Sequence, residues 1–432
     1  MNFIRLLLQH KLNRDIAWTI GSFMVLAVSG IVINLVIAWY RDAASLGVFN
    51  QAYAVYIVAS QVAAFGLHYS VLRHAAYYER AESERNRMLL TAAGLALACG
   101  AAVSLVVAAA SGWIGELLDS GQTGRAVTYV AAGLLLFPLN KVLLAYLNGL
   151  RRMKAYAGIQ ALRYLLIMLW VSLISVSDRP FELSTLGFFV AELGSMAVAL
   201  FHLLRSGLVR YAPPDRKWLR RHLGFGAKSL LAGMFVEINS RVDVLMIGVF
   251  LADRYVGIYS FAAMLVEGLY HVLSMVRINF NPVLVGAIRD GEWEQARRLL
   301  GMSRRYGYPV MLVLATAVLL VFHVLTVYVL PEKGLEPGMT PLLILLAGLT
   351  LIAAYIPFDN LLLVSGHPGY QTMQHMTVVL ANVLLNLLLV PLLGIGGAAL
   401  ATAASYLVGI GVLIYLVNRF LHWNLFLNRR ND

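Results

Sequence analysis

Long apolar runs alternate with short charged connectors along almost the whole chain. Runs of about 20 residues recur between Ile16 and Leu416, and a helix of that length rises about 30 Å, the thickness of the hydrocarbon core of a bilayer. The runs lack the strict alternation of apolar and polar residues that is typical of membrane-barrel strands. The pattern therefore predicts an all-α polytopic membrane protein with about twelve transmembrane helices, near residues 16–39, 46–72, 88–112, 126–148, 156–177, 184–204, 224–251, 256–282, 306–330, 341–365, 370–392 and 396–418.

The composition agrees with this pattern and narrows the possible functions. Hydrophobic residues make up 60% of the 432 residues and charged residues only 13%, whereas soluble domains carry about 25% charged residues. A soluble enzyme is therefore excluded. Cys99 is the single cysteine, so neither a disulfide framework nor a thiol metal site is expected. The sequence contains no phosphate-binding loop, metal-ligand cluster or nucleophilic triad, which predicts no enzymatic activity and no cofactor.

Basic residues are distributed unequally between the two sides of the predicted spans. One set of connectors carries most of the 34 Lys and Arg residues, while the opposite set carries only Arg41, Arg125, Arg179, Arg254 and Lys333. Because basic loops stay in the cytoplasm, both termini are predicted to be cytoplasmic. These loops also account for most of the net charge of +12. They lack the interleaved aromatic residues of a base-stacking surface, so we expect no nucleic-acid partner.

The most basic connector, residues 205–222, divides the predicted spans into six and six and contains the turn-forming sequence Ala-Pro-Pro-Asp. The two halves resemble each other. Segments 34–52 and 243–262 both have a polar residue near the end of a span, an Arg/Asp turn, and then a Gly-aliphatic-aromatic sequence. We interpret residues 1–204 and 223–432 as two pseudo-symmetric six-helix lobes around a central cavity, joined by a cytoplasmic linker. Chance similarity between hydrophobic hairpins is the alternative.

Several ionisable side chains fall inside the predicted spans, where a charge costs about 2.5–3.5 kcal/mol or more and therefore faces a cavity or a partner. Polar stripes occur in spans of both halves and predict a wet cavity. Their charged or titratable members include Lys228, Asp243, Glu267, His271 and Arg277. Internal ion pairs, such as Glu237 with Arg241 one turn later, and hydrogen bonds between helices are the alternative.

Other ionisable residues lie in spans outside these stripes. Lys141 and Arg163 are expected to extend towards the cytoplasm or to pair with neighbours, and Glu192 lies in another span. Asp359 follows Pro357 in the sequence YIPFDN. A proline-broken helix exposes backbone carbonyls, so we regard Asp359 as a candidate cation or proton site.

Two segments resemble one family of transporters. Residues 241–265, RVDVLMIGVFLADRYVGIYSFAAML, combine an aspartate in a span, a turn and a Gly-aliphatic-Tyr opening of the next span. Residues 382–407, NVLLNLLLVPLLGIGGAALATAASYL, combine two asparagines, a proline and a glycine-rich turn followed by Ala-Ala-x-Ala-Thr. With its six plus six spans and basic central loop, the chain resembles the Wzx-type polysaccharide (O-antigen) flippases of the multidrug/oligosaccharidyl-lipid/polysaccharide exporter superfamily.

The resemblance implies a transporter of the bacterial inner membrane. Such a flippase moves an undecaprenyl-pyrophosphate-linked oligosaccharide repeat from the cytoplasmic to the periplasmic leaflet by alternating access. The expected energy source is a gradient of protons or sodium ions, which would make the protein an antiporter. Its product would enter lipopolysaccharide, O-antigen or exopolysaccharide synthesis, with a polysaccharide polymerase and a chain-length regulator as candidate partners.

The candidate binding residues follow from the chemistry of that cargo. A pyrophosphate needs cations in a low-dielectric cavity, and the candidates are Lys228, Arg277, Arg241, Arg14 and Arg73. Sugars need hydrogen-bonding and stacking groups, and the candidates are Asn50, Tyr53, Tyr56, Gln61, Tyr259 and Asn239. Ion coupling needs titratable groups, and the candidates are Asp243, Glu267, His271 and Asp359. We rank Glu267 first, because His271 one turn later would share its proton.

Three other functions were weighed against this one. A cation-coupled multidrug exporter of the same superfamily would share the fold but have a more acidic and aromatic cavity. A membrane O-antigen polymerase or ligase would carry a large periplasmic loop, which these short connectors do not provide. A scaffold without transport activity would not need charged residues at membrane depth in both halves.

Overall fold

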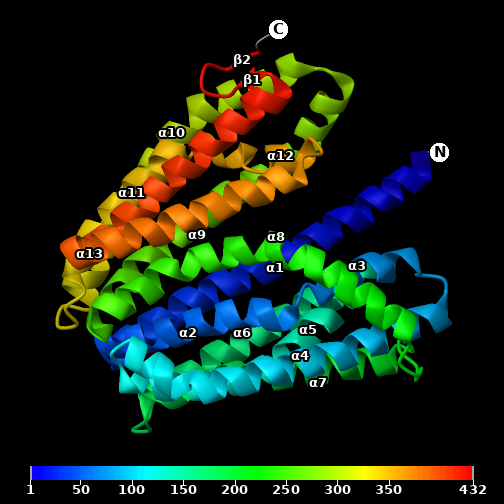
Figure 1. Ribbon diagram of the computed structural model, residues 1–432. Coiled ribbons are helices and arrows are strands. Elements are labelled where there is room, and N and C mark those ends of the chain that lie inside the picture. Colours follow the sequence, from blue (N-terminus) through cyan, green and yellow to red (C-terminus); the bar gives the residue numbers. More distant parts are fainter. Residues whose placement is uncertain (1, 431–432) are drawn as a thin grey trace. The chain divides into compact units, whose positions relative to one another are not determined.

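The computed structural model describes residues 2–430, and their side chains outside 2–13, 16, 231–233, 278 and 430. Most of this chain is helical (Figure 1). The helices are α1 (Asn2–Tyr40), α2 (Ala43–Ala64), α3 (Leu67–Tyr77), α4 (Glu82–Leu117), α5 (Gly121–Gly149), α6 (Met153–Val176), α7 (Gly187–Arg205), α8 (Arg216–Phe250), α9 (Asp253–Asp290), α10 (Trp293–Val324), α11 (Met339–Ile352), α12 (Leu361–Val364) and α13 (Pro368–Leu421). Short helical turns are η1 (Phe181–Leu186), η2 (Leu325–Val329), η3 (Glu336–Gly338) and η4 (Ile356–Phe358).

The number of helices that can cross a membrane agrees with the sequence prediction. In the described part of the chain, eight helices are long and apolar enough to do so, and two bent pairs, α2 with α3 and α11 with α12, raise the number to ten. Helix α13 has 54 residues and a non-helical break at Gly394, so it supplies one further span. Helix α8, with 35 residues, covers the predicted span 224–251 and is the twelfth. The protein is therefore an all-α, multi-pass membrane protein, as predicted.

The chain forms two compact units. Unit 1 comprises Met1–Arg41 and Val48–Glu237, and unit 2 comprises Asp42–Gly47 and Ile238–Asp432. The predicted linker 205–222 falls within unit 1, which also includes the first part of α8. The division into transport lobes at that linker stays a prediction.

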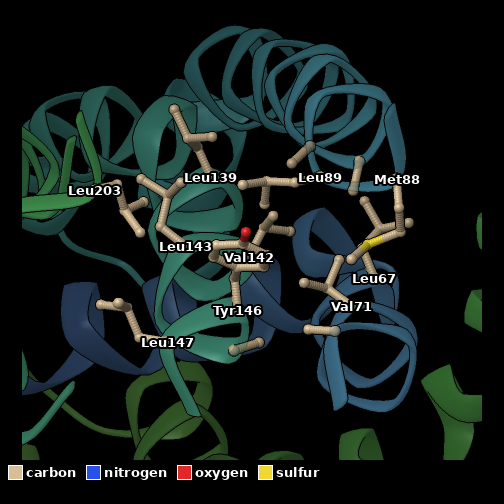
Figure 2. Packing of buried hydrophobic residues seen from close by; sticks show 14 of the residues in the cluster. Leu67, Val71, Met88, Leu89, Leu139, Val142, Leu143, Tyr146, Leu147 and Leu203 are labelled. Atoms are coloured by element: carbon tan, nitrogen blue, oxygen red, sulfur yellow. The ribbon is translucent and has the colours of Figure 1, made fainter. Parts of the chain in front are cut away.

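The core of unit 1 is built around α5, whose apolar stretch is largely buried. Glycine allows α4 to approach it, because a Cβ at Gly100 would lie only 2.5 Å from the carbonyl oxygen of Leu135. Aliphatic side chains of α5 pack with those of α3, α4 and α7 (Figure 2). The labelled members of this cluster are Leu67, Val71, Met88, Leu89, Leu139, Val142, Leu143, Tyr146, Leu147 and Leu203.

Two spans bend where the sequence supplies glycine or proline. Helices α2 and α3 meet at 49° across Gly66, whose φ of 64° is a left-handed conformation that glycine adopts without strain. Helix α11 and the segment formed by η4 and α12 meet at 57° across residues 353–355, directly before η4, which contains Pro357. The predicted helix break in YIPFDN is confirmed, because proline lacks the N–H that would continue the helix.

A small antiparallel ribbon follows α13 and covers part of the unit 2 core. Strand β1 (Trp423–Asn424) pairs with β2 (Arg429–Arg430). The buried Trp423 ring lies 6.1 Å from Phe358 and 6.2 Å from Trp293, in edge-on contacts. The sequence did not predict this ribbon, because two-residue strands are too short to show an alternating pattern.

Candidate functional site

A buried carboxylate in unit 2, Asp243 of α8, is surrounded by hydrogen-bond donors. The Tyr259 hydroxyl of α9 donates to it at 2.8 Å, and Asn386 Nδ2 of α13 donates at 2.9 Å. The Thr402 hydroxyl donates to the same carboxylate. Asn382 Oδ1, one turn before Asn386, accepts a hydrogen bond of 2.8 Å from Asn386 Nδ2. We call these five residues the Asp243 cluster.

The break in α13 brings both halves of that helix to this carboxylate. Gly394 has φ 59° and ψ −139°, a conformation open to glycine but not to larger residues. The backbone then approaches itself so closely that a Cβ at Gly397 would lie 2.1 Å from the carbonyl oxygen of Leu389. As a result, Asn386 and Thr402 contact the same side chain from opposite sides of the break.

The Asp243 carboxylate has no cationic partner among the residues whose side chains the structure describes. The ion pairs of 4.0 Å or less between described residues do not include this carboxylate, which is 8% exposed. Asn386 Oδ1 is also buried and accepts no hydrogen bond. A buried carboxylate without a counter-charge is costly, and oxygen-rich sites suit hard cations. The Asp243 cluster therefore has the chemistry to bind a proton or a small hard cation.

A second polar site of unit 2 lies at the break between α11 and α12. Arg277 Nη1 of α9 is 3.0 Å from Asp359 Oδ2. Gln374 Nε2 donates to Asp359 Oδ1 at 3.3 Å, and Gln371 Nε2 donates to the Asp359 carbonyl at 2.9 Å. The carbonyl that the broken helix exposes thus has a partner, and the charge of Asp359 is balanced by Arg277.

Two further predicted residues of unit 2 pair with each other. Arg241 Nη2 lies 3.5 Å from Glu267 Oε1. The Glu267 side chain is 42% exposed, and His271 one turn later is exposed as well. Glu267 therefore has a cationic partner and an exposed side chain, in contrast to Asp243.

Unit 1 contains a fully buried acid, Glu192 of α7, at the centre of another cluster. Arg163 Nε of α6 donates to Glu192 Oε1 at 2.6 Å, and the Tyr56 hydroxyl of α2 donates to the same oxygen at 2.8 Å. Asn140 Nδ2 of α5 donates to Glu192 Oε2 at 2.6 Å and to Ser195 Oγ at 3.1 Å. We call these five residues the Glu192 cluster. The cluster connects α2, α5, α6 and α7, and the charge of its acid is balanced by Arg163.

Aromatic rings stack beside the Glu192 cluster. The Phe188 ring lies 4.6 Å from Tyr56, 5.5 Å from Tyr53 and 6.0 Å from Phe49. Tyr56 is fully buried, whereas Tyr53 is only partly buried. Tyr53 is thus the predicted glycan residue of this stack that keeps an accessible surface.

Other predicted glycan residues make hydrogen bonds to polar side chains. Asn50 Nδ2 donates to Asn34 Oδ1 at 3.1 Å, and Gln61 Nε2 donates to Ser60 Oγ at 3.4 Å. Asn239 Oδ1 accepts a long hydrogen bond of 3.4 Å from Asn382 and so lies at the edge of the Asp243 cluster.

The remaining predicted cations belong to unit 1. Lys228, Arg14 and Arg73 are all exposed. The guanidinium carbon of Arg73 lies 5.6 Å from the centre of the Phe225 ring. The structure therefore presents three unshielded positive charges on this unit.

Sequence reasoning found the charged members of both clusters and missed most of the neutral ones. Asn386 and Thr402 contact Asp243 from within the segment 382–407 that carries the family resemblance. The two asparagines spaced one helical turn apart were a signal that could have identified them. Asn140 and Ser195 gave no such signal, because single polar residues in a span are commonly hydrogen-bonded to a neighbouring helix.

One titratable group that precedes the predicted span 224–251 has a strongly perturbed pKa. His222 Nδ1 lies 2.9 Å from Ser70 Oγ, and His222 Nε2 lies 3.1 Å from the Met88 carbonyl oxygen. Burial lowers the pKa of His222 to about 4. The neutral imidazole attaches the start of α8 to α3 and α4.

Comparisons with known proteins agree with this architecture. A family model described as "Polysaccharide biosynthesis protein" matches residues 12–278. No curated protein matches the sequence. Among solved structures, the chain is similar to an inward-facing multidrug resistance MATE family transporter of the MOP superfamily, with a TM-score of 0.71 and 14% identity over 91% of this chain and 94% of the other.

Two further structures have the same fold. Lipid II flippase MurJ in an inward closed conformation gives a TM-score of 0.69 and 15% identity over 93% of this chain and 87% of that one. A MOP superfamily transporter from Pyrococcus furiosus gives a TM-score of 0.61 and 14% identity over 95% of both chains. At these identities the likeness shows the fold, which is that of membrane transporters.

Proposed function

Because the chain belongs to the polysaccharide biosynthesis protein family and has the fold of MOP-superfamily transporters, we propose that it is a lipid-linked oligosaccharide flippase. The proposed cargo is an undecaprenyl-pyrophosphate-linked glycan repeat. It moves from the cytoplasmic to the periplasmic leaflet of a bacterial inner membrane by alternating access. The observation that carries the proposal is the family match, which extends over residues 12–278 and reaches into α9 of unit 2.

The cations of the protein support an anionic head group as cargo. Lys228, Arg14 and Arg73 are exposed on unit 1. In unit 2, Arg277 is bound to Asp359, and both side chains remain partly exposed at 21% and 17%. A pyrophosphate oxygen competes with a carboxylate for a guanidinium group, because both accept two parallel hydrogen bonds from it. We propose that Arg277 exchanges Asp359 for the head group during transport.

The proposed glycan contacts come from side chains that keep accessible surface. Tyr53 offers a ring face for a sugar, and Gln61 offers an amide. The hydroxyls of Tyr56 and Tyr259 donate to Glu192 and Asp243. We therefore give these two tyrosines a role in orienting the acids, rather than in holding the sugar.

The Asp243 cluster is the proposed coupling site. Glu267 and Asp359 each have an arginine partner within 4.0 Å, whereas the carboxylate of Asp243 receives hydrogen bonds from neutral groups. Binding of a proton or a sodium ion neutralises this buried charge. Occupancy of the cluster then changes the relative stability of conformations in which α8, α9 and α13 pack differently, which is the requirement for coupling. This assignment moves the first-ranked coupling residue from Glu267 to Asp243.

A multidrug exporter of the same superfamily is the second candidate, because the fold is also that of a MATE family transporter. Purified protein in liposomes separates the two. We expect an undecaprenyl-pyrophosphate-linked oligosaccharide, added to one leaflet, to become accessible to a glycan-binding lectin on the other side, and a cationic dye to be transported no faster than in empty liposomes. Dye transport without movement of the glycan would establish the exporter and overturn the flippase.

A further inference from the structure

Cationic residues inside the predicted spans divide into two groups. Five Lys or Arg residues lie at membrane depth, and the three arginines each pair with an acid: Arg163 with Glu192, Arg241 with Glu267, and Arg277 with Asp359. The two lysines, Lys141 and Lys228, have no carboxylate within 4.0 Å among the residues that the structure describes. Lys228 is exposed, but Lys141 is mostly buried.

The surroundings of Lys141 provide a second positive charge and an aromatic ring. Its ammonium lies 5.4 Å from the centre of the Phe137 ring, and the guanidinium carbon of Arg163 lies 5.2 Å from the same ring. The charge of Arg163 is balanced by Glu192, which leaves Lys141 as the surplus cation of this group. Contact with one phenyl ring does not replace the hydration and counter-charge that a buried ammonium loses.

The neighbouring titratable groups do not remove this surplus. Glu192 and Glu237 are the acids whose charges act on Lys141, and both carboxylates lie more than 4.0 Å from its ammonium. His68 of α3 is close enough to Lys141 for their charges to interact, and its Nδ1 is buried without a hydrogen-bond partner. The side chain of Lys141 keeps part of its surface exposed, so a ligand can reach it.

We infer that Lys141 binds the diphosphate group of the lipid-linked substrate. This inference rests on the proposed function and adds to it a binding residue on α5. The Lys141 ammonium offers positive charge to an anion, and the unsatisfied His68 imidazole offers a polar contact. Among the described residues, no carboxylate lies within 4.0 Å of this ammonium. A diphosphate oxygen supplies a counter-charge in direct contact with the ammonium, and so binding of the substrate stabilises the buried lysine.

The test compares two lysines that make similar ring contacts. Lys154 is exposed in the first turn of α6 in the same unit, and its ammonium lies 5.7 Å from the centre of the Trp18 ring. Binding of undecaprenyl pyrophosphate to the full-length protein in detergent is measured by isothermal calorimetry. We expect Lys141→Met to raise the Kd about tenfold or more, Lys141→Arg to change it about threefold or less, and Lys154→Met to leave it unchanged. Undecaprenol, which has no phosphate, is expected to bind wild type and Lys141→Met equally.

Melting temperatures provide a second measurement. Lys141→Met is expected to melt at or above the wild-type temperature, because an unpaired buried charge has been removed. If Lys141→Met does not fold, Lys141→Gln decides by the same criterion of Kd. If a variant loses affinity tenfold but keeps the wild-type melting temperature, Lys141 contributes to binding of the ligand and not to stability of the fold.

The outcomes distinguish the inference from the proposed function. If wild type binds undecaprenyl pyrophosphate and the neutral variants bind it equally well, the assignment of Lys141 is wrong while the flippase proposal stands. If wild type does not bind this lipid, the proposed function fails and the inference fails with it. Competition by inorganic pyrophosphate at equal concentration would identify a soluble diphosphate as the ligand and overturn the assignment to a lipid.

Discussion

Gly47 and Gly257 pack against each other so closely that neither position has room for a side chain. A Cβ on Gly47 would lie 1.8 Å from the carbonyl oxygen of Asp253, and a Cβ on Gly257 would lie 1.8 Å from the carbonyl oxygen of Ala43. The contact is reciprocal, as contacts about a local two-fold axis are. Both glycines also begin the Gly-aliphatic-aromatic sequence that repeats in the two halves of the chain. This close approach of α2 and α9 agrees with the predicted repeat. It also explains why both positions are glycine, since any side chain there would overlap the facing backbone.

Gly257→Ala is expected to destabilise the protein by about 1–3 kcal/mol, because the methyl group forces two backbones apart. Gly268→Ala is the matched control, since it lies in the same helix with no atom within 4 Å of its added Cβ. The control is expected to be neutral or up to about 1 kcal/mol more stable, because alanine favours helix. Thermal unfolding in detergent measures both. Equal melting temperatures of Gly257→Ala and wild type would show that the contact between Gly47 and Gly257 is not tightly packed.

The Glu192 cluster allows a test of how burial affects an ion pair, because another pair of unit 1 has the same N–O distance but is more exposed. Glu192→Gln leaves the mostly buried Arg163 without its counter-charge and is expected to cost about 3–5 kcal/mol of stability. Glu182→Gln breaks the Arg125–Glu182 pair, which has the same 2.6 Å distance, but there the arginine side chain is 62% exposed. That control is expected to cost about 1 kcal/mol or less.

The double variant Arg163→Met with Glu192→Gln completes this comparison. It removes both charges, so we expect it to recover most of the stability that Glu192→Gln loses. Melting temperatures of the single and double variants provide the measurement. A double variant as unstable as Glu192→Gln would show that the hydrogen bonds of Tyr56 and Asn140, rather than the unpaired charge, determine the loss.

His222 predicts a pH dependence of stability. Its pKa is about 4 in the folded protein and about 6.5 when unfolded, so the unfolded state binds the extra proton between these values. The contribution of His222 is therefore complete above pH 6.5 and is lost as the pH falls towards 4, by roughly 3 kcal/mol. Melting of wild type and His222→Gln is compared from pH 4 to 8. We expect a steeper decline for wild type below pH 6.5, and parallel curves above it.

The sequence predicted spans and charged residues better than it predicted their pairing. Apolar length alone indicates where a helix crosses a bilayer, and Pro357 marked a break that the structure contains. Helical periodicity, in contrast, relates residues of one helix and contains no information about other helices. Arg241 lies 3.5 Å from Glu267 of α9, and Arg277 lies 3.0 Å from Asp359, which follows the break between α11 and α12. Such contacts depend on how helices pack, which a single-span pattern does not encode.

The same limit explains the choice of coupling residue. Glu267 and His271 look like a proton-sharing pair from their spacing on one helix. The structure gives Glu267 an arginine partner, and it brings Asn386 and Thr402 to Asp243 by a reversal of the chain at Gly394. A non-helical glycine in a long apolar run has no periodic signature. The oxygen-rich surroundings of Asp243 therefore became visible only in three dimensions.

Coupling through Asp243 is tested by comparing two neutral variants. A ligand that binds only the folded state raises its stability, by about 2.7 kcal/mol at a hundred times its Kd. If the Asp243 cluster binds sodium, NaCl is expected to raise the melting temperature of wild type and of Glu267→Gln above the value in KCl, and to have no such effect on Asp243→Asn.

In liposomes, Asp243→Asn is expected to flip the lipid-linked glycan at a rate independent of an imposed sodium gradient, while the rate of Glu267→Gln still depends on that gradient. If the ion is a proton, the same contrast appears with a pH step and is absent with sodium. A variant pair with the opposite behaviour, in which Glu267→Gln loses gradient dependence and Asp243→Asn retains it, would return the coupling role to Glu267.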